Sequence, residues 1–433
     1  MKRPMSAQER AQRVARVREA AAQEAERLFE EALRLLEKGD SPGWEAAEKA
    51  VRDGTRRMGA TILESALGVW GNGYEHSVLP CACGKGLRYV NDRERRLVSL
   101  LGPMRLRRAY YRCPHCGATR FPLDVRLGIA GTDFSPSVRQ VMARLGAPEP
   151  FAQGRRLLGE LTGLWISPRS HRLVSEAAGG ALPDRTSHFP CPAGPRDDLY
   201  LLADGVHAPT REGWREVKLG VAFTARPDRD GLPRRLHAGY FADVLEAETF
   251  GERWFALAQA ARFDRARRLV VLADGAPWIW NLVDLHFPGA IGIVDWYHAL
   301  ERLWATAHAV WGQDHPAAAH WVHSVRKLLR NGQIERRVAR IAQLPARSKA
   351  ARDAVRETQG YFSRNADRMR YRRFRRLGLF IGSGVVEAGC KHIVGSRLKG
   401  PGMRWSLQGL RDILALRLAV LFGPWPPLSA LAA

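Results

Sequence analysis

Two eight-residue stretches, DLYLLADG at 198–205 and RLVVLADG at 268–275, decide how this sequence is expected to fold. Each is a short apolar run, the pattern of a buried β-strand, followed directly by Asp-Gly. The two acids are Asp204 and Asp274. Asp-Gly most often marks a turn. Because the same context occurs twice, however, the pattern favours two neighbouring strands that end in carboxylates at one edge of a sheet.

The elements expected around these stretches follow the order of an α/β fold. Strand-like runs at 214–226 and 234–241 follow the first stretch, and a helix is expected from about 243 to 263. After the second stretch come a helix at 277–287 and a fifth strand at 290–294. Three strands, a helix and a fourth strand are the order of a ribonuclease-H-like sheet. We therefore predict a ribonuclease-H-like catalytic core.

Paired carboxylates fit two-metal chemistry. Two Mg²⁺ ions about 4 Å apart can activate a nucleophile and stabilise the leaving oxygen when a phosphodiester is cut. Hard cations of this kind prefer carboxylate oxygens, and Gly205 and Gly275 would let DNA or metal-bound water approach closely. A third carboxylate from a helix would complete the site. Glu387 is the candidate, because Ser383 can cap a helix that carries Glu387 in its first turn.

Other carboxylates compete for this third place. Asp295 is close in fold order, Glu216 is expected on a strand of a hairpin, and Asp284 is expected to face solvent. From Trp296 to about Phe374 the chain is helical in pattern and very basic, which predicts an α-helical insertion that lies along DNA phosphates. The alternative is a solvated charged surface.

Four cysteines between Leu79 and Asp124 have the spacing of a zinc site. Two of them, Cys81 and Cys83, lie on one short loop, and Cys113 and Cys116 lie on another, which suits the four thiolates of tetrahedral Zn²⁺. Strand-like runs at 88–90, 96–101 and 104–112 predict a zinc ribbon. A redox dithiol pair, two disulfides and a ligand role for His115 stay open as alternatives. The last two cysteines, Cys191 and Cys390, are expected to be packing thiols.

Helical regions are expected on both sides of these cysteines. Residues 8–38 and 44–70 have the pattern of two long amphipathic helices, which either pack locally or mediate oligomerisation. Residues 135–180 have the layout of a helix-turn-helix DNA reader, although short connecting helices would have the same pattern. The second helix of this pair begins with Arg169, Ser170, His171 and Arg172, of which Arg169 and Arg172 are the candidate DNA contacts.

The composition bounds the class of protein. A chain of 433 residues predicts two to four folded units. Its 68 Lys and Arg against 44 Asp and Glu give a net charge of +24, which favours a polyanion such as DNA. The alternative is Arg-rich codon usage. We expect a cytoplasmic, nucleoid-associated protein without a membrane partner, because no apolar run is long enough to span a bilayer and the first residues lack a signal peptide.

Several longer motifs resemble a known family. The motifs that carry this similarity are LLADGVHAP, WREVKLGVAF, VVLADGAPWIW, VDWYHALERLW and the ending IGSGVVEAGCKHIVGSRLKGPGMRWSLQGLRDILALRLAVL. Through them the chain is similar to bacterial insertion-sequence transposases of the ISKra type. These belong to the DDE superfamily, which is related to Mutator-like elements. The resemblance covers nearly all of 199–421, and the cysteine region and the helix-turn-helix also look like that family. The helices before Trp70 match less well.

The resemblance implies a role for individual residues. Asp204, Asp274 and Glu387 match the family's catalytic acids, which implies that they hold two Mg²⁺ (or Mn²⁺) ions. The family's Asp-x-x-His element falls on Asp295 and His298, which are assigned to supporting the active site. Its motif after the glutamate covers 400–405, and phosphate contacts are expected from Arg397, Lys399 and Arg404.

The resemblance implies a transposase that binds the terminal inverted repeats of an insertion sequence, cuts the strand and joins it to target DNA. Its partners would be double-stranded DNA, as transposon ends and target, and further copies of itself in a homo-oligomer. The alternatives are a DNA-binding regulator without catalysis and a ribonuclease-H-like nuclease that cuts but does not join. The predicted domains are an N-terminal helical region (1–75), a zinc ribbon (76–128), a helix-turn-helix (129–180), the first part of the core (196–300), the α-helical insertion (301–378) and the C-terminal part of the core with the third acid (379–425).

Overall fold

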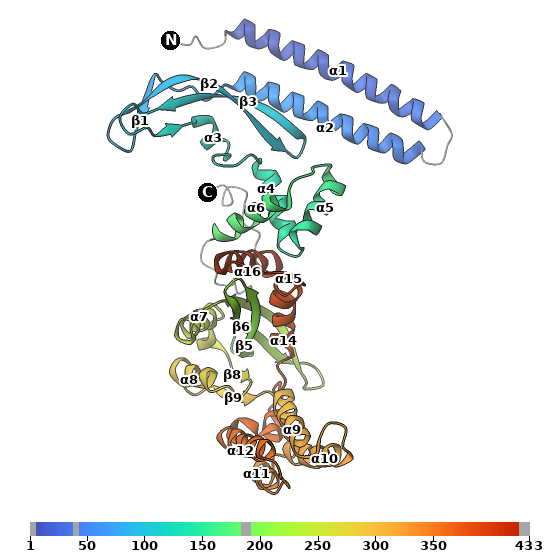
Figure 1. Cartoon of the computed structure of the whole chain (residues 1–433), viewed down its shortest axis with the longest axis vertical. Coiled ribbons are helices and arrows are strands. Elements are labelled where there is room, and N and C mark those ends of the chain that lie inside the picture. Colours follow the sequence, from blue (N-terminus) through green and yellow to red (C-terminus); the bar gives the residue numbers. More distant parts are fainter. Residues whose placement is uncertain (1–5, 38–42, 183–191, 424–433) are drawn as a thin grey trace. The chain divides into compact units, whose positions relative to one another are not determined.

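A computed structural model describes residues 6–37, 43–182 and 192–423 of the chain (Figure 1). The chain divides into two compact units, with the boundary between Ala181 and Leu182. The first unit contains a four-stranded sheet and the second a five-stranded sheet, and most of the remaining described residues are helical. The expected multidomain, mixed α/β organisation is therefore confirmed at this level. Cys191 lies outside the described residues.

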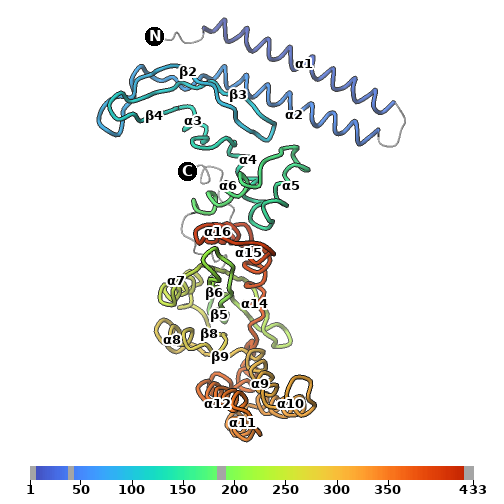
Figure 2. The backbone as a smooth tube through the Cα atoms, viewed as in Figure 1, coloured from blue at the N-terminus to red at the C-terminus, as the bar shows by residue number. Residues whose placement is uncertain are grey.

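Two long helices open the first unit, α1 (Ala7–Glu37) and α2 (Gly43–Trp70), and they pack along each other as an αα-hairpin (Figure 2). Both have the expected bounds to within one residue. In α1 only Leu28 is buried, whereas Phe29, Leu33 and Leu36 are exposed. The hairpin therefore leaves apolar side chains on its surface, and oligomerisation through it stays a prediction.

The sheet of the first unit is antiparallel, in the order β1-β2-β3-β4. Its strands are β1 (Val78–Pro80), β2 (Gly86–Ser99), β3 (Gly102–Arg112) and β4 (Thr119–Arg120). The run expected at 88–90 and most of the run expected at 96–101 form one strand, because the polar residues 91–95 between them pair residue by residue with β3. A short helix, α3 (Pro122–Arg126), follows β4.

Three short helices complete the first unit. They are α4 (Pro136–Gly146), α5 (Phe151–Thr162) and α6 (Pro168–Gly180), as the sequence pattern predicts. Ser135 and Ser167 cap α4 and α6, since each side chain accepts a hydrogen bond from a backbone N–H of the first turn. The small core of this bundle consists of Val138, Met142, Leu158, Leu164 and Ile166.

The second unit is built on a mixed sheet with the strand order β7-β6-β5-β8-β9. β5 pairs antiparallel with β6 and parallel with β8, β6 pairs antiparallel with β7, and β8 pairs parallel with β9. Figure 1 shows α7 (Ala247–Ala260) and α14 (Gly384–Gly389) on either side of β5 and β6. The strands are β5 (Asp198–Thr210), β6 (Gly213–Pro227), β7 (Pro233–Asp243), β8 (Arg268–Ala273) and β9 (Ile291–Val294).

One expectation for this sheet is wrong. The sequence pattern ends the first strand at Asp204, but β5 continues to Thr210 and pairs with β6 over its whole length. The long hairpin between β5 and β6 keeps the polar residues after Asp204 extended, so Asp204 lies within the strand. It is nevertheless the first residue beyond the parallel pairing with β8, which ends at the pair Ala203 and Ala273.

Helices account for the rest of the second unit, and α8 (Pro277–His286) joins β8 to β9. The expected helical insertion begins at Trp296 and consists of α9 (Trp296–Trp311), α10 (Pro316–Arg330), α11 (Ile334–Ala342), α12 (Lys349–Arg364) and α13 (Tyr371–Arg376). After α14 the chain forms a π-helical segment (Cys390–Gly395), α15 (Ser396–Leu398) and α16 (Leu407–Phe422). None of the described helices is long and apolar enough to cross a membrane.

A buried ion-pair cluster fixes the start of β5. Asp198 accepts bidentate hydrogen bonds from both Arg267 and Arg268, at 2.6–3.0 Å. Burial opposes ionisation of Asp198, but the two guanidinium groups outweigh it and hold its pKa below the usual range. This cluster ties β5 to β8 at the end of the sheet away from Asp204.

Asp198→Asn is expected to lower the free energy of unfolding near pH 7 by about 2 kcal/mol, because it leaves two guanidinium groups without a charge partner. A carboxylate with a depressed pKa stabilises the fold above its unfolded pKa of about 4, and this contribution disappears as the pH falls through the folded value. Urea titrations of both proteins should therefore differ at pH 7 and converge in acid. Equal stability at pH 7 would contradict this account.

Candidate metal sites

Three aspartates follow matched positions of three parallel strands. Ala203 in β5 pairs with Ala273 in β8, and Ala273 pairs with Val294 in β9. Asp204, Asp274 and Asp295 are the residues that come next. Since the strands are parallel and in register, the three acids start at the same edge of the sheet.

Asp204 is partly buried and contacts the helical segment that follows Glu387. Its Oδ1 accepts the backbone N–H of Gly205 at 2.7 Å, and its Oδ2 accepts the thiol of Cys390 at 3.4 Å. Burial raises the pKa of Asp204, and the negative charge of Asp274 raises it further, against the two hydrogen bonds. Two carboxylates thus repel each other at this edge of the sheet.

The two Gly residues after the acids have a different role from the expected one. A Cβ on Gly205 would lie 2.2 Å from the Glu216 carboxylate, and a Cβ on Gly275 would lie 2.0 Å from the Tyr361 ring. The close neighbours in this structure are therefore protein side chains. Tyr361 belongs to α12, so Gly275 allows the helical insertion to pack directly beside Asp274, whose Oδ1 accepts the backbone N–H of Ala276 at 2.9 Å.

Asp295 is fully buried and caps α9. Its Oδ1 accepts the backbone N–H of His298 at 2.8 Å and lies 3.2 Å from Nδ1 of the same histidine, while its Oδ2 accepts the backbone N–H of Ser383. The Asp295 carboxylate raises the pKa of His298 to about 9. Without a metal ion, His298 is therefore a cation at neutral pH. The supporting role expected for Asp295 and His298 stays a prediction.

Glu387 reaches the same neighbourhood from α14. It is exposed, and the hydroxyl of Ser383 donates to its Oε1 at 3.0 Å. Ser383 holds the N-cap position, but its side chain accepts no backbone N–H, so the expected capping bond is replaced by this contact with Glu387. Asp295, His298 and Glu387 form a group in which one ligand atom of each lies within 4.8 Å of the others.

The structure brings the predicted acids together only in part. Asp204, Asp274 and Glu387 do not form a group with carboxylate oxygens all within 4.8 Å of one another, whereas Glu387 does so with Asp295 and His298. Cys390, three residues beyond Glu387, contacts Asp204 and so connects the helical segment after Glu387 to the first predicted acid. Cys390 was expected to be a packing thiol. Cys390 lies about one helical turn after Glu387, so the sequence spacing alone could have predicted that Cys390 is close to the acids.

The other competing acids are engaged elsewhere. The Glu216 carboxylate pairs with Lys218 at 2.7 Å, and Lys218 also donates to the carbonyl of Leu245. The Asp284 side chain is 73% exposed on α8 and lies 3.9 Å from Arg368. The expectation that Asp284 faces solvent is confirmed.

The four cysteines of the first unit form a second group. The Sγ atoms of Cys81 and Cys83 are 3.5 Å apart, those of Cys81 and Cys116 are 3.5 Å apart, and those of Cys83 and Cys113 are 3.7 Å apart. A tetrahedron with Zn–S bonds of about 2.3 Å has edges of about 3.8 Å, whereas a disulfide would need about 2.05 Å. The cluster can therefore hold a metal such as zinc. His115 is exposed and not part of the group.

Two of these thiols differ in how easily they lose a proton. Backbone N–H groups of Cys116 and His115 lower the pKa of Cys113 to about 6, against the effect of burial. The backbone N–H of Lys85 lowers the pKa of Cys83. Hydrogen bonding with the neighbouring sulfurs outweighs this effect and raises the pKa of Cys83 to about 12. A divalent cation favours the thiolate form of all four, which is the form that ligates.

The predicted DNA contacts differ in accessibility. Arg169, Lys399 and Arg404 are exposed, and Arg172 pairs with Glu176 at 3.0 Å. Arg397 is 1% exposed and lies over the Trp405 ring, so the expected phosphate contact is not available to it in this structure. His171, expected at the start of the reading helix, is also fully buried, and its two ring nitrogens lie 2.7 Å and 3.1 Å from the carbonyls of Met142 and Phe151.

Comparison of the whole chain with protein-family models and with curated proteins finds no match.

Proposed function

We propose that this protein is a DDE transposase of the ISKra type, which cuts DNA strands at the ends of an insertion sequence and joins them to a target. The observation that carries the proposal is the sheet edge at which Asp204, Asp274 and Asp295 follow three registered parallel strands, with Glu387 reaching the same neighbourhood from α14. The strand order β7-β6-β5-β8-β9 is that of a ribonuclease-H-like core, which supports the same proposal.

The residues at this edge fit divalent cations. Burial and the charge of Asp274 both raise the pKa of Asp204, so two ionised carboxylates are costly here unless a cation lies near them. Carboxylate oxygens are the ligands that Mg²⁺ prefers. We infer that Asp204, Asp274 and Glu387 hold two Mg²⁺ or Mn²⁺ ions, which would activate water or a 3′-hydroxyl and stabilise the leaving oxygen.

The protein's own groups then orient the site. Cys390 and the backbone N–H of Gly205 hold the Asp204 carboxylate, and Ser383 holds that of Glu387. The Asp295–His298 pair keeps an imidazolium beside the acids at neutral pH, where it can attract the phosphate of a DNA strand. Tyr361 of the insertion packs on Gly275 and shields one side of Asp274.

The first unit would supply DNA recognition and a structural metal. We propose that the four cysteines bind Zn²⁺ in a zinc ribbon, and that α4 to α6 form a helix-turn-helix with Arg169 exposed for phosphate contact. The net charge of +24 favours double-stranded DNA as the partner.

The proposal is tested with DNA that flanks the gene. We expect the protein to nick this DNA with Mg²⁺ and not without added Mg²⁺ or Mn²⁺, and to join the exposed 3′-end to a supercoiled plasmid. DNA binding without nicking would support a regulator instead. Nicking without joining would support a ribonuclease-H-like nuclease, and either result would reject a transposase.

A further inference from the structure

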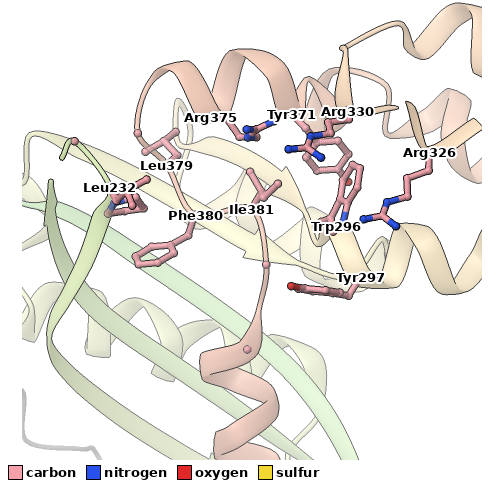
Figure 3. Close-up of a pocket in the computed structure, with 15 residues that line it drawn as sticks. Leu232, Trp296, Tyr297, Arg326, Arg330, Tyr371, Arg375, Leu379, Phe380 and Ile381 are labelled. Atoms are coloured by element: carbon pink, nitrogen blue, oxygen red, sulfur yellow. The ribbon is translucent and has the colours of Figure 1, made fainter. Parts of the chain in front are cut away.

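A cavity of about 650 Å³ lies in the second unit and is lined by none of the predicted catalytic acids (Figure 3). Its walls come from the start of α9, from α10 and α13, from residues 378–384, and from the turn between β6 and β7 at 231–233. Aromatic and basic side chains line much of it.

Three arginines give the cavity a positive charge. Arg326 and Arg330 reach it from α10 and Arg375 from α13, and Figure 3 shows them around Tyr371 and Trp296. All three are exposed, and none of their side chains forms an ion pair or a hydrogen bond within the part of the chain that the structure describes. None of the described residues that line the cavity carries a carboxylate. Guanidinium groups bind phosphate bidentately, so the charge fits a phosphate-bearing ligand.

Aromatic rings form a second part of the cavity wall, and a ligand that was only a phosphate would not need them. Tyr297 is 59% exposed, and its ring lies against Gly382, where a Cβ would come within 2.8 Å of the ring. The Trp296 ring packs edge-on against Tyr371 at 5.0 Å, and the Tyr371 hydroxyl donates to the carbonyl of Val294 at 2.8 Å. This wall is therefore fixed to strand β9. A nucleobase can stack on an exposed aromatic face, and such stacking contributes about 1–3 kcal/mol of binding free energy per base.

The cavity lies next to the candidate active site. Trp296 and Tyr297 lie between Asp295 and His298 in the chain, and the backbone N–H of Trp296 donates to the carbonyl of Ile381 at 2.9 Å. The neighbouring Ser383 contacts both Asp295 and Glu387. A nucleotide next to one bound at the acids would therefore lie close to the cavity.

We propose that this cavity binds an unpaired nucleotide of the DNA strand next to the reacting phosphodiester. Its base stacks on Tyr297, and its phosphate is held by Arg326, Arg330 and Arg375. Bases in a duplex are already stacked, so the aromatic wall selects a strand that has separated from its complement. This inference rests on the proposed function, since it names a subsite for the same DNA substrate.

The test uses the full-length, zinc-loaded protein with no Mg²⁺ or Mn²⁺ added, so that no cleavage takes place. Fluorescence anisotropy measures binding of labelled octathymidylate and of a labelled glutamate octapeptide. We expect tighter binding of the oligonucleotide. The variant R326A/R330A/R375A should weaken it at least tenfold, and Tyr297→Leu about tenfold, while Tyr297→Phe keeps the ring and the affinity.

A charge-matched control is available on the same insertion. Arg336, Arg372 and Arg376 are exposed and do not line the cavity. The variant R336A/R372A/R376A should therefore weaken binding less than threefold. Equal losses in both triple variants would overturn the proposal in favour of general charge attraction. Equal binding of the peptide, with no effect of Tyr297→Leu, would overturn it in favour of a simple anion site.

These outcomes are separable from those of the proposed function. Oligonucleotide binding through the cavity without Mg²⁺-dependent nicking would keep the subsite and reject the transposase. Nicking that is unaffected by the cavity variants, with unchanged octathymidylate binding, would keep the transposase and reject the subsite.

Discussion

Asp274→Asn is expected to lower the rate of Mg²⁺-dependent DNA nicking on the order of 1,000-fold or more, which corresponds to about 4 kcal/mol of lost transition-state stabilisation. Asn keeps the size of the side chain and an oxygen that can accept the N–H of Ala276, so the turn before α8 should persist. The amide has no charge, however, and binds Mg²⁺ far more weakly than a carboxylate. Single-turnover nicking and duplex binding should be measured on the same preparation.

A matched control exists in the next helix. Asp284 lies on α8 with its side chain largely exposed. Asp284→Asn removes the same charge from the same unit and should leave nicking within about twofold of the wild type. If Asp274→Asn nicked DNA as fast as Asp284→Asn, the assignment of Asp274 as a metal ligand would be wrong.

The second large effect is expected in the cysteine cluster. Cys113→Ser should abolish zinc binding and unfold the end of the sheet that carries the cysteines, because the core cluster there is small: Leu79, Leu87, Ala109, Tyr111 and Cys113. Structural zinc contributes on the order of 10 kcal/mol or more to the folding of small zinc domains. Metal analysis should show about one zinc per wild-type chain and almost none in the variant. Limited proteolysis should then cut the variant within residues 78–120.

His115 provides the control for this experiment. It lies between Cys113 and Cys116 but outside the cluster, and it is exposed. His115→Ala should therefore keep its zinc and its resistance to protease. Loss of zinc in His115→Ala, or full zinc in Cys113→Ser, would show that the ligands are assigned incorrectly.

Local patterns predicted the elements of this fold well. Apolar runs bounded by Asp-Gly gave β5 and β8, and the Ser-Pro pairs at Ser135 and Ser167 gave the starts of α4 and α6. Long-range pairing was harder to predict. The extension of β5 beyond Asp204, and the continuity of β2 through its charged middle, both depend on a partner strand that supplies backbone hydrogen bonds regardless of side-chain polarity.

The sequence predicted the acids of the candidate site, but it predicted less about the residues that contact them. Asp-Gly after each strand indicates Asp204 and Asp274, because register places both at one sheet edge. The contact of Cys390 with Asp204 depends on how the segment after α14 packs against the sheet, which no local pattern encodes. The same holds for burial, since the sequence predicts Arg397 as a phosphate ligand, but in the fold Arg397 is buried and lies over the Trp405 ring.

The central claim is that Asp204, Asp274 and Glu387 hold paired divalent ions. Anomalous diffraction from a crystal of the full chain soaked in Mn²⁺ would locate such ions directly. We predict two peaks at the edge of the sheet, both in contact with Asp204 or Asp274 and one of them also in contact with Glu387. A peak on Asp295, His298 and Glu387, with none at Asp204 or Asp274, would contradict the account.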